Sequence, residues 1–219
     1  MSDFKRPTRW SYSSVSTYKA CPQKWRFSYI DNLPGDTSAA MSRGTRMHAM
    51  AEEYVLGKIT FCPPEIKKVG PMLEMFKTLK AQPEEVWLLD KDWKHTNDLS
   101  QAWIKSIIDV TYRVDDVLFV KDYKSGRMYP DHAEQLELYG LMGMCKFPDV
   151  KRVEYAAIYL DTGHEGHEGS IIRAMTDKLR AKWDRDALVM MTDEVYEPRP
   201  GPACRWCSYK KENGGPCLY

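Results

Sequence analysis

The chain has 219 residues, of which 43% are hydrophobic, so it is long enough to bury one substantial core. Its net charge of +1 comes from 32 basic and 31 acidic side chains, so bulk charge argues neither for nor against a polyanionic partner. Because no apolar run approaches the ~18–20 residues of a membrane span and no signal peptide opens the chain, we expect a soluble, cytoplasmic protein with no membrane partner.

Two short helices are predicted within residues 11–30, because serines suited to an N-cap open this segment and Pro22 interrupts it. The break between them falls at Cys21. A longer helix is predicted over residues 42–56, where Gly57 supplies the glycine that commonly follows a helix.

A further amphipathic helix is predicted over residues 65–80, kinked at Gly70-Pro71. Segments rich in β-branched and aromatic residues follow, with Asp115-Asp116 as a tight turn between the last two. These predicted strands cover residues 86–89, 102–114 and 117–123.

The second half of the chain is predicted to continue with a helix, two strands and a helix. A hairpin loop is expected at residues 163–169, between the two strands. The helices cover residues 131–145 and 176–191, and the strands cover 153–160 and 170–173. Helices alternating with a group of strands predict one α/β domain with a central mixed sheet flanked by helices.

The strands around Asp115-Asp116 carry the most informative residues. A two-residue turn there brings Asp109 directly opposite Asp122, with Cβ atoms about 4.5–5.5 Å apart on one face of the sheet. Like charges so placed are destabilising unless a cation compensates them. Lys124 projects from the same face, because strand side chains alternate with a period of two.

Two carboxylates are ligands that Mg²⁺ or Mn²⁺ prefers, together with phosphate oxygens of a substrate. Such a cation activates water and polarises a phosphoryl group, while the Lys124 ammonium is suited to hold the water or to stabilise the developing charge. The pair therefore predicts cleavage of a phosphodiester. The alternative is a surface hairpin with unrelated charges, but Asp109 lies in an apolar run where an unpaired carboxylate is costly.

At these residues the chain resembles the PD-(D/E)XK nuclease superfamily, and within it the RecB-like exonucleases. Asp109 followed by Asp122-Tyr-Lys124 matches their Asp…(Asp/Glu)-X-Lys core. Gly44-Thr-Arg-Met-His48 is similar to their Gly…His motif, and Gln135-Leu-Glu-Leu-Tyr139 to their Gln-X-X-X-Tyr motif.

The resemblance implies a restriction-endonuclease-like core and assigns roles to these positions. It implies that His48 and the backbone carbonyl of Tyr123 are metal ligands beside Asp109 and Asp122. It also implies that Gln135 and Tyr139 orient the site and touch DNA, so that both join Lys124 and the two aspartates in the predicted catalytic set.

Three late cysteines, Cys204, Cys207 and Cys217, predict a metal centre that takes a fourth thiol from Cys21. Spacing alone does not distinguish zinc from an iron–sulfur cluster. The segment Tyr18-X-X-Cys21-Pro-X-X-Trp25 resembles the entry motif of iron–sulfur RecB-like nucleases, including the CRISPR-associated exonucleases and the AddB-type enzymes. That resemblance implies a 4Fe–4S cluster, although the nine residues between Cys207 and Cys217 exceed the family's usual gap.

One RecB-like nuclease domain is therefore expected over residues 1–219. Its cluster-binding lobe is expected in residues 11–30 and 198–219, and its nuclease core in residues 42–192.

The function that the resemblance implies is a metal-dependent DNA exonuclease acting on single-stranded or processed ends. Recombination, repair, or phage or CRISPR DNA processing is its expected setting, in the host cytoplasm if a phage encodes it. A homo-oligomer or a recombination partner protein is possible. A non-catalytic nucleic-acid-binding subunit and an enzyme acting on another phosphoester stay open as alternatives.

Overall fold

A computed structural model describes residues 6–35 and 38–219. It divides into two compact units. One combines the described part of Met1–Thr37 with Lys182–Tyr219, and the other is Ser38–Ala181. Within the described residues, no helix has the length and apolarity that a bilayer crossing requires.

The unit Ser38–Ala181 is built on a five-stranded mixed sheet with strand order β1-β2-β3-β4-β5. The β3–β4 pair is parallel and the other three pairs are antiparallel. The strands are β1 (Gln82–Leu89), β2 (Ile104–Val114), β3 (Val117–Lys124), β4 (Arg152–Tyr159) and β5 (His164–Ile172). This arrangement confirms the predicted α/β class.

The β2–β3 hairpin has the predicted register. Val114 pairs with Val117, and the ladder runs back to Val110 opposite Lys121. Asp115 takes the left-handed conformation, with φ of 53°, that the tight turn requires. The turn therefore fixes which residues of the two strands face each other.

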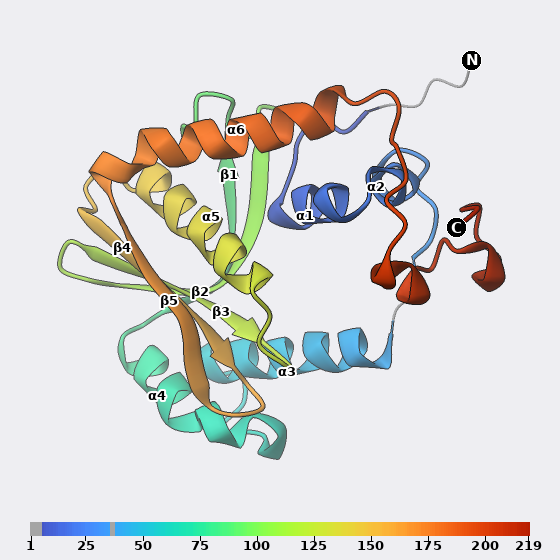
Figure 1. The fold of residues 1–219 in the computed structure, drawn as a ribbon. Helices are drawn as coiled ribbons and strands as arrows, with labels where there is room; N and C mark the ends of the chain where they lie inside the picture. Colours follow the sequence, from blue (N-terminus) through green and yellow to red (C-terminus); the bar gives the residue numbers. More distant parts are fainter. Residues whose placement is uncertain (1–5, 36–37) are drawn as a thin grey trace. The chain divides into compact units, whose positions relative to one another are not determined.

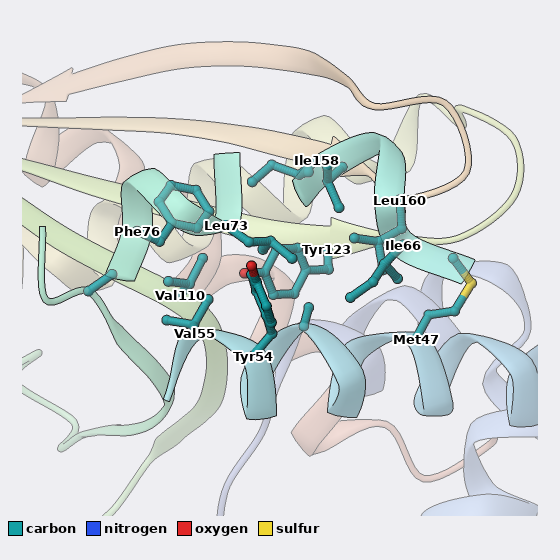
Figure 2. Close-up of a cluster of buried hydrophobic side chains, with 13 residues drawn as sticks. Met47, Tyr54, Val55, Ile66, Leu73, Phe76, Val110, Tyr123, Ile158 and Leu160 are labelled. Atoms are coloured by element: carbon teal, nitrogen blue, oxygen red, sulfur yellow. The ribbon is translucent and has the colours of Figure 1, made fainter. Parts of the chain in front are cut away.

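Helices cover both faces of this sheet (Figure 1). On one face, α3 (Ala39–Val55), the 3-10 helix η1 (Pro64–Val69) and α4 (Gly70–Thr78) bury apolar side chains. Figure 2 shows this core, in which Met47, Leu73 and Phe76 surround Tyr123 of β3 and Ile158 of β4. The predicted kink at Gly70 appears as the change from 3-10 to α-helix.

On the opposite face, α5 (Asp131–Lys146) packs closely against the sheet because two of its residues are glycines. A Cβ atom on Gly140 would lie 2.8 Å from Cδ1 of Tyr155 and 3.0 Å from Cδ1 of Ile171. A Cβ atom on Gly143 would lie 2.9 Å from Cδ2 of Leu118. The absence of side chains thus sets how near the helix lies to β3, β4 and β5.

Gly140→Ala is expected to destabilise the protein by about 1–3 kcal/mol, because the added methyl group overpacks this interface. Alanine is otherwise the better helix former by about 1 kcal/mol, so the expected sign is opposite to that of an exposed helical glycine. Urea unfolding of both proteins measures the difference. Gly201→Ala is the control, because nothing lies within 4 Å of its Cβ position, and a loss as large in the control would contradict the packing argument.

The predicted hairpin loop at residues 163–169 was wrong, because β5 begins at His164 and the turn lies before it. The glycines that suggested a loop lie within the strand, where neighbouring side chains pack against their backbone. A Cβ atom on Gly169 would lie 2.4 Å from the Tyr155 hydroxyl, and one on Gly166 would lie 3.2 Å from Cε2 of Tyr159. These glycines make room for two β4 rings and do not end the strand.

The other unit contains α1 (Tyr12–Ala20), α2 (Pro22–Tyr29) and the end of α6 (Thr176–Thr192). Ser11 caps α1, and Cys21 separates α1 from α2 as predicted. Stacked aromatic rings form the interior, with Trp10 on Trp183 and Trp25 on Tyr196. This unit also has short 3-10 helices over Pro202–Trp206 and Lys211–Asn213, and a further one, Arg173–Met175, precedes α6 in the unit Ser38–Ala181.

Candidate active site

Asp109 and Asp122 lie on the neighbouring interior strands β2 and β3, at the positions that follow the Val110–Lys121 pair. Both are buried, with exposed fractions of 9% and 3%. The Tyr123 backbone N–H donates a hydrogen bond of 2.6 Å to Oδ2 of Asp109. The hairpin therefore holds two buried carboxylates next to each other.

This proximity is electrostatically costly in the absence of a cation. Burial and then the charge of Asp109 raise the pKa of Asp122 to about 6, and Lys124 offsets only part of this shift. Nζ of Lys124 lies 2.6 Å from Oδ2 of Asp122. This ammonium pairs with Asp122, and the charge of Asp109 still acts on the same carboxyl group. A divalent cation would compensate the remaining charge, and oxygen ligands of this kind are those that Mg²⁺ and Mn²⁺ prefer.

Lys124 is held from its other side by α5. Its Nζ donates to Oε1 of Gln135 at 2.7 Å, and Nε2 of Gln135 donates to the hydroxyl of Tyr139 at 2.7 Å. Gln135 and Tyr139 lie one helical turn apart on the face of α5 that covers the sheet. The structure thus joins both residues to Lys124 in one line of hydrogen bonds.

His48 reaches the same carboxylates from α3. Its Nδ1 lies 3.4 Å from Oδ2 of Asp109. Burial lowers the pKa of His48, but its hydrogen bond with Asp109 and the charge of Asp109 outweigh burial, so the pKa is raised overall. Gly44, one turn earlier, lets α3 approach the residue after Lys124, since a Cβ atom there would lie 2.8 Å from Oγ of Ser125.

Glu84 is a site residue that sequence reasoning missed. On β1 it occupies the position opposite Asp109, between the pairs Pro83–Val110 and Glu85–Ile108. Its φ of 53° is unusual for a residue with a side chain. Burial, followed by the charge of Asp109, raises its pKa. Glu84 therefore extends the row of carboxylates onto a third strand.

Asp161 is a second residue that was missed. It forms an ion pair with Arg43 of α3 and accepts a hydrogen bond of 2.6 Å from the Gly126 backbone N–H. Asp161 thereby ties the segment after Lys124 to the start of α3. Its position just beyond β4 becomes meaningful only once β3 and β4 are paired, so no local signal identifies it.

The four predicted cluster cysteines lie in the other unit and line one pocket. The cavity has a volume of about 60 Å³. Backbone N–H groups donate to two of the sulfurs, from Arg199 to Cys21 at 3.5 Å and from Gly201 to Cys204 at 3.3 Å. Cys207 and Cys217 complete the thiol lining. Among the described residues, no group of three or more His, Cys, Asp or Glu side chains is arranged so that it could hold a metal ion.

The chain matches the model of a known protein family. The family model of the PD-(D/E)XK nuclease superfamily matches residues 9–106 and 98–211 of this chain. No curated protein matches it.

The solved structures that are similar to the chain include the following two. One, from Eubacterium rectale, is named "Putative exonuclease"; it is 10% identical, with a TM-score of 0.56, and the match covers 97% of this chain and 89% of that one. The other is the crystal structure of SSO0001, 17% identical with a TM-score of 0.45, covering 95% and 87% of the two chains. At such identities the first likeness shows a shared fold.

Proposed function

Because the chain belongs to the PD-(D/E)XK nuclease superfamily and has its restriction-endonuclease-like fold, we propose that it is a divalent-metal-dependent deoxyribonuclease. The observation that carries the proposal is the juxtaposition of two buried carboxylates with an ammonium. Asp109 and Asp122 are neighbours on one face of the sheet, and Lys124 contacts the second of them. An ion pair with Lys124 needs only one carboxylate, whereas the proposed divalent-cation site uses both Asp109 and Asp122.

Each residue then has a distinct task. Asp109 and Asp122 would hold the cation, with His48 and the carbonyl of Tyr123 as further ligands. Lys124 positions the attacking water or stabilises the negative charge that builds on the phosphorus centre. When bound, Mg²⁺ or Mn²⁺ supplies water activation and polarisation of the phosphoryl oxygen.

The α5 residues act on this lysine. Gln135 accepts a hydrogen bond from Lys124 and is itself held by Tyr139, so the ammonium is kept in a defined orientation. A long lysine side chain loses conformational entropy when it is fixed, and this chain of contacts pays that cost before substrate binds. Gln135 is only partly buried and is the member of this pair that can also contact DNA beside Lys124.

We propose that the substrate is a DNA end, single-stranded or processed, and that cleavage is exonucleolytic. The similar structure named "Putative exonuclease" supports this choice. Recombination, repair, or phage or CRISPR DNA processing would supply such ends.

End-labelled single-stranded and double-stranded DNA, incubated with the protein in Mg²⁺, Mn²⁺ or EDTA, tests the proposal. Successive shortening from one end in either metal, and none in EDTA, is expected. Internal fragments alone would show that the protein is an endonuclease and not an exonuclease. Absence of cleavage in every metal would favour a non-catalytic DNA-binding role.

We also propose that Cys21, Cys204, Cys207 and Cys217 ligate a 4Fe–4S cluster. Their shared cavity is several times larger than the ~10–15 Å³ that one water occupies, so it suits a group of several atoms. The N–H groups directed at two of the sulfurs resemble the hydrogen bonds that stabilise cluster thiolates. When bound, the cluster would cross-link residues nearly a whole chain apart.

Anaerobic purification should give a brown protein that absorbs near ~400 nm and contains iron and sulfide. Cys204→Ser should lose the colour and most of the iron. Cys145→Ser is the matched control, because Cys145 lies on α5, outside this pocket. A colourless protein with one zinc per chain, or full iron content in Cys204→Ser, would contradict the cluster.

A further inference from the structure

A second group of polar rings lies next to Lys124 and has no role in the site described above. Lys124 of β3 pairs with Tyr159 of β4, and the Tyr159 hydroxyl contacts Nδ1 of His132 at 2.8 Å. His132 lies three residues before Gln135 on α5, so it is one turn nearer the start of that helix. The contact of Tyr159 with His132 therefore lies beside that of Lys124 with Gln135.

His167 of β5 joins this pair. The β4–β5 ladder shifts register between Tyr155 and Ala157, and His167 has a φ of 53° within that irregularity. A bulge of this kind re-aims a side chain. The His167 ring lies 5.9 Å from the ring of His132, centroid to centroid, at an angle of 85°.

One nitrogen of this group lacks a partner. Nε2 of His167 is buried, yet it has no hydrogen bond within the described residues. A buried polar atom without a partner costs about 1–3 kcal/mol, so such atoms usually have a ligand or water to bond. The His167 ring lies next to a second imidazole and to the phenol of Tyr159, which is the strand partner of Lys124.

His132 is suited to be a neutral donor. Burial, followed by the charge of Lys124, lowers its pKa, and burial raises the pKa of Tyr159. A neutral phenol that donates to Nδ1 leaves the proton of His132 on Nε2. The pair can then donate to a phosphate oxygen without adding charge beside Lys124.

An exposed aromatic ring completes the group. Tyr129, in the segment before α5, is 54% exposed and packs edge-to-face on His132 with 5.7 Å between ring centroids. Exposed rings beside phosphate-binding groups are the platforms on which unpaired bases stack in single-strand-binding proteins. A paired base is stacked within its duplex and is not free to use such a platform.

We infer that Tyr129, His132 and His167 form a subsite for the nucleotide that flanks the scissile phosphodiester in single-stranded DNA. His132 donates to its phosphate, Tyr129 stacks on its base, and Tyr159 and His167 position His132. This inference rests on the proposed nuclease function and specifies its substrate. It favours an unpaired strand over a duplex end.

The test compares wild type with Tyr129→Ala and His132→Gln on single-stranded oligonucleotides. Each variant should raise KM about tenfold, in line with the loss of one stacked base or one phosphate contact, with kcat changed less than threefold. His164→Gln is the matched control, because His164 is an exposed histidine of the same strand as His167. Tyr129 is exposed, so its variant is expected to fold normally.

Substrates altered at one position make the assignment specific. Methylphosphonate linkages are placed one at a time along the strand. At one linkage the change should raise the KM of wild type about tenfold. At the same linkage it should raise the already higher KM of His132→Gln by less than twofold. An abasic nucleotide beside that linkage should raise the KM of wild type about tenfold and that of Tyr129→Ala by less than twofold. If the variant and the altered substrate each raise KM independently, so that the two factors multiply, the subsite is refuted.

The outcomes separate this inference from the proposed function. Cleavage by wild type with an unchanged KM in both variants would refute the subsite alone. If wild type cleaves nothing, fluorescence anisotropy with a labelled oligonucleotide replaces KM, and the same tenfold losses in affinity are expected. Equal binding by wild type and both variants would then refute the subsite as well.

Discussion

Lys124→Ala is expected to lower the rate of DNA cleavage by about 10²–10⁴-fold while leaving the fold intact. The ammonium contacts Asp122 and Gln135 and is the basic group nearest the carboxylates among the contacts described above. Its removal takes away the group that holds water or stabilises the transition-state charge. Initial rates with end-labelled single-stranded DNA in Mg²⁺ measure the loss.

Lys121→Ala is the matched control for this substitution. Lys121 lies on the same strand, but its Nζ pairs with Glu165 at 2.9 Å and not with the site. It should keep cleavage within a fewfold of wild type at a temperature where both proteins are folded. Comparable losses in both variants would mean that Lys124 acts through stability and not through chemistry.

Asp122→Asn is expected to abolish cleavage and yet to stabilise the metal-free protein at pH 8, by about 1–3 kcal/mol. Burial and the neighbouring charge of Asp109 raise the pKa of Asp122 to about 6 from an ordinary value of 3.8. The ionised carboxylate is therefore disfavoured in the folded protein. Asparagine has nearly the same shape without the charge.

The pH dependence follows from the sign of that shift. Between pH 3.8 and about 6 the folded protein binds more protons at Asp122 than the unfolded chain does. The free energy of unfolding therefore falls as pH rises through this window, and it stays lower above it. His48, with its pKa also raised, acts in the same direction at higher pH.

Urea unfolding of metal-free wild type and Asp122→Asn at pH 4, 6 and 8 measures both effects. The curves should agree near pH 4 and separate by pH 8, with the variant more stable. Addition of Mg²⁺ at pH 8 should stabilise wild type and leave the variant unchanged. A variant less stable than wild type at pH 8 without metal would show that the Lys124 ion pair outweighs the cost of burial.

The nuclease hairpin could be predicted from sequence because its determinants are local. A two-residue turn sets the register of the strands that it joins, so Asp115-Asp116 determined which residues of β2 and β3 are paired. Alternation then assigned Asp109, Asp122 and Lys124 to one face. The helix that carries Gln135 and Tyr139 was also predicted, over residues 131–145, and the structure has it as α5.

The first and last strands were less predictable because neighbours in space define them. The prediction began the first strand at Val86, where the β-branched and aromatic residues begin. Pro83 and the acidic residues next to it are unfavourable in strands. Pairing with β2 nevertheless extends β1 back to Gln82, which brings Glu84 opposite Asp109. In β5, Gly166 and Gly169 resembled loop residues because the rings of β4 that cover them are distant in sequence.

The cysteines illustrate an intermediate case. Spacing identified Cys204, Cys207 and Cys217 as a group that needs a fourth thiol, with Cys21 as the candidate, and the family resemblance then implied a 4Fe–4S cluster. Only the fold shows that all four line one cavity. The sequence likewise gave no sign that His167 turns toward His132, because the bulge that redirects it depends on the pairing of β4 with β5.

The location of a bound cation tests the central claim most directly. Anomalous diffraction from crystals soaked in Mn²⁺ should show a peak within about 2.0–2.6 Å of carboxylate oxygens of both Asp109 and Asp122. The same peak should be absent from crystals of Asp122→Asn. An active enzyme with no Mn²⁺ between these carboxylates, or with Mn²⁺ bound only elsewhere, would contradict the assignment of the hairpin as the catalytic metal site.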